Sequence, residues 1–429
     1  MLRRFIVLLM PVATIFRYLK PVVSPREDSG KFVEGARRFI REHVGHNDRV
    51  EIMVSGGADS TVTAALFHLE VGDRLYVTHV DTGFMRQFRG REESETIAEK
   101  FADFKNFKLV NARPLFYEKV IGIPDAEEKR LGFRRAYEIA TDQQMVESEC
   151  NVMTQGTILP DIIETEGGVK SQHNVFLKFS KVEKVVEPVA GLCKDEIRKV
   201  AAYLFEEYGL KALENASRRQ PFPGPGLSVR TVGTITPEKL DVEKRANDIV
   251  EQVVDAYTHR QYGVNMFIDL KTGEQIPFQS FAATFDDQVA EAPVSVKDAV
   301  VEVIGARASC YLLDVKATGV KDGSRIYSRP LCLEGDFEPS YELLNRIGSV
   351  IPTRTGVSRM LYRVNAKVGS GKYVVAVRSV NSVDAMTATV NPLPLQTLRA
   401  IADEVARSCD VRRVYWDITP KPPATIEYE

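Results

Sequence analysis

Residues 51–67 read EIMVSGGADSTVTAALF, and this stretch decides the fold. An apolar run that predicts a strand ends at Ser55, and the hydrophobic pattern of a helix begins at Ser60. Two glycines, an aspartate and two serines fill the junction. Glycine lets the main chain turn with positive φ and approach a ligand closely, and the first turn of a helix carries unpaired N–H groups that bind anions. The junction is therefore either a capped helix start or a phosphate site.

The aspartate of this loop helps to separate the two interpretations. Phosphate would repel the carboxylate of Asp59 unless a cation lay between them, and Mg²⁺ binds carboxylate and phosphate oxygens together. The loop is not a Walker A motif, because no Gly-Lys-Ser/Thr follows it. We therefore expect a cradle for Mg²⁺ and a polyphosphate, with Asp59 as the metal ligand. A helix cap without any ligand is the alternative.

The segments on both sides of the loop alternate between strand and helix patterns. Strands are expected at 50–54, 74–80, 107–111 and 151–154, and helices at 32–44, 60–69, 92–101 and 134–148. This alternation predicts a doubly wound parallel α/β sheet. Ligands of such sheets bind beyond the carboxyl ends of the strands, where the SGGADS loop and the sequence Asp81-Thr82-Gly83 both lie.

The second half of the chain has a different order of predicted strands and helices. A run dense in proline and glycine, RRQPFPGPGLSVR at 218–230, predicts a boundary. Beyond it, the order strand, strand, helix, strand occurs twice, over 310–364 and 373–418, which predicts an α+β region of two related lobes. We expect an α/β domain at 29–226 and the two lobes at 227–429.

Residues 1–28 form an N-terminal extension whose role the sequence leaves open. Its apolar stretch at 5–16 has 12 residues, fewer than the roughly 20 that a membrane-spanning helix needs. A peripheral anchor, an added helix and an extended start codon are the alternatives.

Composition excludes several classes of protein. The 429 residues carry a net charge of −2, so no basic surface indicates a nucleic-acid partner. The five cysteines are scattered and form no CxxC pair, which is typical of free thiols in the cytoplasm. The histidines show no paired spacing for a structural metal.

Longer motifs point to a family. Ser-Gly-Gly-x-Asp-Ser after the first strand resembles the N-type ATP pyrophosphatases, which cleave ATP between the α and β phosphates. Other stretches resemble GMP synthetase in the family's order, over roughly residues 30–429: VDTGFMR (80–86), DAEEKR (125–130), TQGTILPDIIET (154–165), KSQHNV (170–175), EPVAGLCKDEIRK (187–199), the Pro-Gly run, VDAMTA (383–388) and DITPKPPATIEYE (417–429). The chain therefore resembles the ATP-pyrophosphatase subunit of GMP synthetases, in the version with a two-lobed dimerisation-type domain.

The resemblance implies a ligase of purine biosynthesis that uses ATP and Mg²⁺. ATP would adenylate O2 of XMP, and ammonia would displace AMP to give GMP. Asp59 and Lys194 would be the catalytic residues. The ATP and pyrophosphate site would comprise Ser55, Gly56, Gly57, Ala58, Asp59, Ser60, Val80, Asp81, Gly83, Phe84, Gly156, Thr157, Asp161 and Lys194. The XMP site would comprise Pro223, Gly224, Pro225, Arg230, Arg325, Lys421, Thr425, Ile426 and Glu427. A lid that excludes water would comprise Lys170, Ser171, Gln172, His173 and Asn174.

Some positions depart from the family pattern. The family lid reads KSHHNVGGLP, whereas this chain has Gln172 for a histidine and Phe176-Leu177 for two glycines, and the final EWE is EYE. These changes keep open the alternative of a related enzyme that adenylates a different acceptor.

A glutaminase centre is not evident in this sequence. None of the cysteines lies in the GxCxG setting of a class I glutamine amidotransferase. Ammonia would then be free or supplied by a separate glutaminase subunit. The oligomeric state, monomer or homodimer, stays open.

Overall fold

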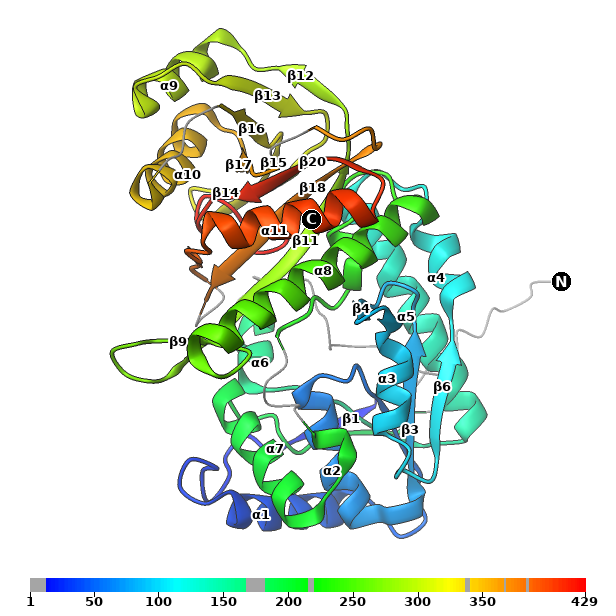
Figure 1. The fold of residues 1–429 in the computed structure, drawn as a ribbon. Coiled ribbons are helices and arrows are strands. Elements are labelled where there is room, and N and C mark those ends of the chain that lie inside the picture. Colours follow the sequence, from blue (N-terminus) through cyan, green and yellow to red (C-terminus); the bar gives the residue numbers. More distant parts are fainter. Residues whose placement is uncertain (1–12, 167–181, 215–219, 336–339, 366–367, 383–385) are drawn as a thin grey trace, which may run out of the picture. The chain divides into compact units, whose positions relative to one another are not determined.

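The computed structural model describes residues 13–166, 182–214, 220–335, 340–365, 368–382 and 386–429. The chain forms two compact units that interleave along the sequence (Figure 1). Unit 1 comprises residues 1–83, 93–115 and 135–219, and unit 2 comprises residues 84–92, 116–134 and 220–429. The linear divisions expected after residues 28 and 226 stay predictions.

Unit 1 contains a six-stranded sheet in which all neighbouring strands are parallel. The predicted doubly wound α/β class is therefore confirmed. The strand order is β1 (Thr14–Arg17), β8 (Lys184–Glu187), β7 (Val152–Thr154), β2 (Val50–Met53), β3 (Leu75–Asp81) and β6 (Phe107–Asn111).

The strand order places a topological switch point between β2 and β7. From β2 the chain proceeds through β3 to β6 on one side, and β7, β8 and β1 complete the other side. Ligands of doubly wound sheets bind in the crevice at such a point, outside the carboxyl ends of the strands. The loop that follows β2 and the loop that follows β7 both lie there.

Helix α1 (Ser29–His43) shows why the sequence forms these elements. The Asp28 side chain accepts a hydrogen bond from the Lys31 amide at 3.0 Å and caps the helix, which begins at Ser29, three residues before the predicted start. The buried residues Phe32, Val33, Ala36 and Ile40 lie on one face. The other helices with residues in unit 1 are α2 (Ala58–Val71), α3 (Glu93–Lys100), α4 (Arg113–Val120), α5 (Ala126–Ser148), α6 (Leu159–Glu166) and α7 (Lys194–Tyr208).

Part of the N-terminal extension belongs to the sheet. Strand β1 pairs in parallel with β8 over residues 184–187 and forms an edge of unit 1. The Arg17 guanidinium donates to the Glu187 carboxylate at 2.7 Å. Neither β1 nor β8 was predicted from the sequence.

Unit 2 contains a mixed sheet of two halves with matching pairings, although the strand at 278–286 lies before both copies predicted at 310–364 and 373–418. Strands β11 (Phe278–Asp286), β18 (Tyr373–Asn381) and β20 (Val411–Asp417) form one half, with an antiparallel and then a parallel pairing. Strands β13 (Ser309–Leu313), β16 (Leu331–Glu334) and β17 (Met360–Arg363) repeat these pairings in the other half. Antiparallel pairing of β17 with β20 joins the halves into one continuous sheet. Strand β12 (Val289–Glu291) extends its edge, and β19 (Thr389–Val390) pairs with β18.

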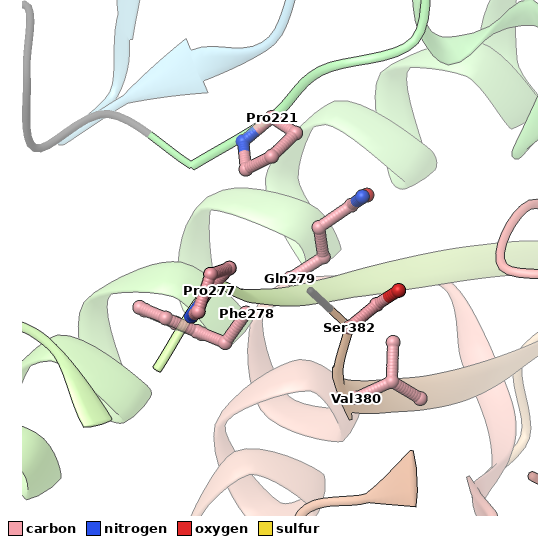
Figure 2. Close-up of a pocket in the computed structure, with 6 residues that line it drawn as sticks. All are labelled: Pro221, Pro277, Phe278, Gln279, Val380 and Ser382. Atoms are coloured by element: carbon pink, nitrogen blue, oxygen red, sulfur yellow. The ribbon is translucent and has the colours of Figure 1, made fainter. Parts of the chain in front are cut away.

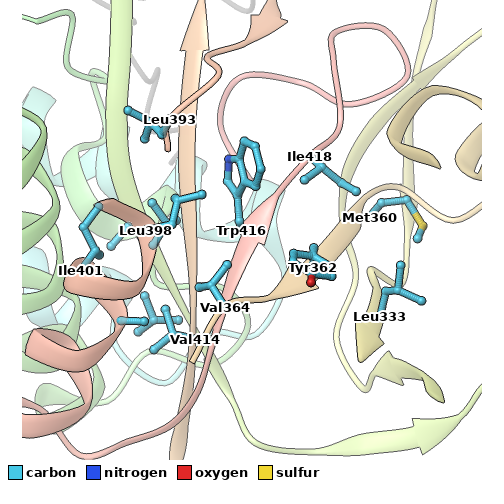
Figure 3. Close-up of a cluster of buried hydrophobic side chains, with 14 of the residues drawn as sticks. Leu333, Met360, Tyr362, Val364, Leu393, Leu398, Ile401, Val414, Trp416 and Ile418 are labelled. Atoms are coloured by element: carbon cyan, nitrogen blue, oxygen red, sulfur yellow. The ribbon is translucent and has the colours of Figure 1, made fainter. Parts of the chain in front are cut away.

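Helices pack their apolar faces against this sheet. Figure 3 shows Leu398 and Ile401 of α11 (Leu395–Ser408) beside Val414 and Trp416 of β20, within one cluster of buried side chains. Burial of large apolar side chains is the main stabilising term in such a core. The other helices are α8 (Pro237–Tyr262), α9 (Val294–Ile304) and α10 (Tyr341–Thr355), and the hairpins are β4–β5 (Gln87–Phe88, Arg91–Glu92), β9–β10 (Phe267–Ile268, Gln275–Ile276) and β14–β15 (Ala317–Lys321, Ser324–Ser328). Over the residues that the structure describes, no helix combines the length and the apolar character needed to cross a membrane.

Candidate functional site

The loop between β2 and α2 has the geometry of an anion cradle. Gly56 adopts φ +73°, a conformation that favours glycine. Gly57 occupies the N-cap position of α2 and has no side chain with which to cap the helix. The Ser60 hydroxyl donates to the Gly57 carbonyl at 3.2 Å and accepts from the Ser55 amide at 3.3 Å, which holds the loop closed on itself. A glycine N-cap leaves the first N–H groups of the helix to an external anion, so the phosphate interpretation is favoured over the capped helix.

The two predicted catalytic residues lie in direct contact. Lys194 is the first residue of α7, whose start is set by a capping box in which the Cys193 amide donates to Glu196 at 2.9 Å. The Lys194 ammonium forms an ion pair with Oδ2 of Asp59 in the first turn of α2. These residues are 135 positions apart in the sequence. Two helix starts therefore bring a cation and a carboxylate to the same loop.

Asp59 keeps one oxygen available for a metal. Its Oδ1 is buried and has no hydrogen-bond partner in the described part of the chain. Within that part, no three His, Cys, Asp or Glu side chains converge as a metal site. A cation here would therefore be held by Asp59 together with phosphate oxygens, which is the usual manner of binding Mg²⁺ at nucleotide sites. The residues present fit Mg²⁺.

The loop after β7 packs directly on the loop at 55–60, which we name the phosphate loop after its predicted ligand. A Cβ atom on Gly156 would lie 2.6 Å from the Ser60 nitrogen and 2.7 Å from the Asp59 carbonyl carbon, so only glycine fits. The adjacent Thr157 hydroxyl donates to Oε1 of Glu187 at 2.5 Å. Asp161, in the first turn of α6, accepts from the Ile158 amide at 3.1 Å. The structure therefore brings Gly156 beside Asp59 and Ser60.

The turn after β3 is organised by its aspartate. Oδ1 of Asp81 accepts from the Gly83 amide at 3.0 Å, and Oδ2 pairs with the Arg113 guanidinium at 2.8 Å. Gly83 has φ +77°, and Val80 is buried. Asp81 thus shapes the turn.

Phe84 belongs to unit 2, where its ring is fully buried. It packs edge-on against Tyr117 and Phe133, with ring centroids 5.6 and 5.9 Å away. Its carbonyl accepts from the Leu227 amide at 2.8 Å, next to the Pro-Gly run.

In unit 2, two residues predicted for the XMP site bind each other. Arg230 makes two parallel hydrogen bonds of 2.9 Å to the Glu427 carboxylate. Its guanidinium lies 3.8 Å from the centre of the Phe281 ring and 5.2 Å from that of Phe222. The fork geometry and the aromatic face hold Arg230 in one orientation.

The other predicted residues of this site lie on the same unit. Pro223 and Pro225 are half-buried and Gly224 is exposed. Thr425 is within hydrogen-bond distance of Thr318, at 2.5 Å, and Ile426 packs on the cluster that contains Phe281. The backbone of Lys421 pairs with Ala388, and Arg325 on β15 forms an ion pair with Glu127 at 3.2 Å. An anionic ligand at Arg325 would compete with that carboxylate.

Sequence comparison identifies the family. Residues 364–428 match the GMP synthase C terminal domain family. A subunit of the glutamine-hydrolyzing GMP synthase of Saccharolobus solfataricus is 35% identical over 412 residues, which cover 94% of this chain and all of that protein. The subunit of the same name from Methanopyrus kandleri is 35% identical over 405 residues, covering 94% and 99%.

The chain belongs to the family of GMP synthase ATP-pyrophosphatase subunits. The predicted family, the ligase class and the role in GMP synthesis are thereby confirmed. An NH3-dependent NAD synthetase from Campylobacter jejuni aligns in space over 44% of this chain and 77% of that chain, with 16% identity and a TM-score of 0.33, which is too low to support an argument.

The site of this GMP synthase subunit contains further residues that the sequence analysis missed. Arg113 pairs with Asp81, and Arg17 pairs with Glu187, whose other oxygen holds Thr157. Glu187 opens the EPVAG motif and could have been selected from it. Arg17 and Arg113 carry no local signal, because only the strand order brings them to their partners.

A pocket in unit 2 is shown in Figure 2. It is lined by Pro221, Pro277, Phe278, Gln279, Val380 and Ser382. Its walls are mostly apolar, and none of the residues predicted for XMP lines it. We assign it no role in the site.

The predicted lid, Lys170, Ser171, Gln172, His173 and Asn174, lies outside the described residues. Its role stays a prediction.

Proposed function

We propose that this chain aminates XMP to GMP through an adenyl-XMP intermediate, releasing AMP and pyrophosphate, with ATP and Mg²⁺. The observation that carries the proposal is the contact of Lys194 with Asp59 at the phosphate loop of a chain of the GMP synthase family. A lysine and a metal-binding carboxylate at one anion cradle suit a reaction in which pyrophosphate departs.

The residues of unit 1 have distinct parts in this proposal. The first-turn N–H groups of α2 and the hydroxyls of Ser55 and Ser60 would hold the pyrophosphate, and Asp59 would hold the cation. Mg²⁺, when bound, would neutralise charge on the polyphosphate. The Lys194 side chain is 62% exposed, so its ammonium can turn from Asp59 to the phosphates. Gly156, Thr157, Asp161, Val80, Asp81 and Gly83 would border the nucleotide.

The residues of unit 2 would bind the acceptor. Lys421 and Arg325 would contact the phosphate of XMP, because cations bind phosphate through charge-assisted hydrogen bonds. Pro223, Gly224, Pro225 and Arg230 would line the purine and ribose, and Thr425, Ile426 and Glu427 would close the base side. The lid at 170–174 would keep water from the adenylate.

Ammonia would reach this site free or from a separate glutaminase subunit in the cytoplasm. Each relative is named as one subunit of a glutamine-hydrolyzing enzyme, which supports a divided enzyme. Within this chain, β17 and β20 join the two halves of the unit 2 sheet, which supports a monomeric state. Sedimentation as a stable homodimer would contradict that last point.

The proposal is tested by pyrophosphate release from ATP, Mg²⁺ and ammonium with XMP, IMP or no acceptor. We expect release and GMP formation with XMP, and their loss in Asp59→Ala. Asp73→Ala is the matched control, because Asp73 is 67% exposed and pairs with Lys105 away from the loop. Release with IMP, or without acceptor, would contradict the XMP assignment and favour a related enzyme with another acceptor.

A further inference from the structure

The last twelve residues of the chain form no helix or strand, yet most of them are buried or half-buried. Tyr428 and Ala424 are fully buried, and Glu429 is 2% exposed. Buried carbonyl groups outside regular structure need hydrogen-bond donors, because an unpaired polar group in the interior is costly. The donors for this segment come from a cluster of buried charged side chains in unit 2.

Arg378 on β18 supplies three of these bonds. Its Nε donates to the Ile426 carbonyl at 2.9 Å, and its two terminal nitrogens donate to the Thr425 carbonyl at 2.8 Å and the Thr419 carbonyl at 3.0 Å. The side chain is fully buried. A guanidinium has five N–H donors in a rigid plane, so it can hold several carbonyls in a fixed arrangement.

Arg359, just before β17, reaches the same segment from the other half of the sheet. It donates to the Thr425 carbonyl at 3.0 Å, to the Thr425 hydroxyl at 2.9 Å and to the Glu427 carbonyl. Its guanidinium also lies 3.9 Å from the centre of the Tyr428 ring. The carbonyls of three successive residues, Thr425 to Glu427, are thus held by two arginines.

Asp417, the last residue of β20, balances these cations in part. Its Oδ2 lies 2.8 Å from Arg359 and 2.9 Å from Arg378, and it also accepts from the Tyr428 hydroxyl at 2.8 Å. All three charged side chains are 0% exposed. Two cations and one anion leave an excess of one positive charge beneath the segment.

We propose that Arg359, Arg378 and Asp417, completed by Tyr428, are positioning residues that lock the C-terminal segment in the conformation that binds XMP. This inference rests on the proposed function. None of the four needs to touch the substrate. They preorganise Thr425, Ile426 and Glu427, so that XMP does not have to order the segment when it binds.

The test uses three variants of the full chain. Arg378→Lys keeps the charge but loses the fork of donors, and Tyr428→Phe keeps the ring and removes only the hydroxyl. Arg354→Lys is the control, since Arg354 is 49% exposed and pairs with Glu302 on the surface. Two quantities are measured: the KM values for XMP and ATP in pyrophosphate release, and hydrogen–deuterium exchange of residues 418–429.

We expect the KM for XMP to rise about tenfold in Arg378→Lys and about fivefold in Tyr428→Phe, with the KM for ATP unchanged. Exchange at 418–429 should become faster in both and stay unchanged in the control. A fall in kcat with both KM values unchanged would mean a merely structural role and would overturn the inference.

Failure of the proposed function gives a different result. Wild-type protein that does not turn over XMP would overturn that function, and the exchange measurement would still decide whether the cluster orders the segment. Unchanged exchange in Arg378→Lys and Tyr428→Phe would overturn the inference in either case.

Discussion

The phosphate loop and the C-terminal segment are both irregular, but they are held in opposite ways. The loop is closed by bonds between residues two to five positions apart, such as those of Ser60 to Ser55 and Gly57. The C-terminal segment is held by Arg359 and Arg378, which lie 41 to 68 positions away from their acceptors. A loop with local bonds can be recognised in the sequence, whereas the order of the segment depends on sheet pairing.

Buried carboxylates beneath the two regions show the same contrast. In β2, before the phosphate loop, Glu51 is 1% exposed and burial raises its pKa to about 7. Burial would also raise the pKa of Asp417, but Arg378 and Arg359 outweigh it and lower the pKa below its usual value. Burial without a close cation favours the neutral acid, and burial between two cations favours the carboxylate.

The largest expected effect is on stability, from Asp417→Asn. It leaves two buried guanidinium groups without their counter-charge, and breaking such a cluster costs about 3–5 kcal/mol of unfolding free energy. Urea denaturation measures this loss of unfolding free energy. Asp314→Asn is the control, because Asp314 is 58% exposed and its pair with Arg329 should contribute at most about 1 kcal/mol. Equal losses of unfolding free energy in the two variants would contradict the special role of the buried cluster.

Lys194→Ala should lower kcat by about 10²–10³-fold, because a preorganised cation is lost where charge develops. Unfolding free energy should hardly change, since the Lys194 side chain is 62% exposed. Steady-state kinetics and urea denaturation report the two quantities. Lys105→Ala, at a position that is 68% exposed, serves as the control. A stable variant with normal kcat would remove Lys194 from the proposed reaction.

The raised pKa of Glu51 predicts that stability falls as pH rises, which is opposite to the contribution of Asp417. A pKa of about 7 in the folded state, above the ordinary 4.5, means that the folded protein retains a proton that the unfolded chain has lost. Stability should therefore fall as pH rises from about 4.5 to above 7, by up to about 3 kcal/mol, and Glu51→Gln should lack this fall. Asp417 instead contributes stability that is lost as pH falls below 3.8. Parallel stability curves for wild type and Glu51→Gln would contradict the prediction.

The smallest expected effect is that of Gly156→Ala, of about 1–3 kcal/mol in unfolding free energy, because the added Cβ collides with the backbone of Ser60. The KM for ATP should rise in the same variant, since the collision displaces the phosphate loop. Gly323→Ala offers a comparison, because its added Cβ meets no atom and only its positive φ opposes the change. An unchanged KM for ATP would mean that the contact between these two loops does not affect nucleotide binding.

Local patterns predicted much of unit 1. The strand at 107–111 has the predicted bounds, and α2 extends two residues beyond each end of the helix expected at 60–69. These elements depend on hydrophobic periodicity, which is encoded in adjacent residues. Helix α8 was not predicted, although Thr236 caps it and Pro237 is its first residue.

The sequence by itself determined the α/β class, the phosphate loop and the family, because each rests on residues that are neighbours in the chain. The tertiary structure alone decided which distant groups meet: Lys194 with Asp59, Arg17 with Glu187, and two arginines with the last carbonyls of the chain. The physical reason is that strand order and pairing, which no local pattern encodes, choose the partner of each buried charge.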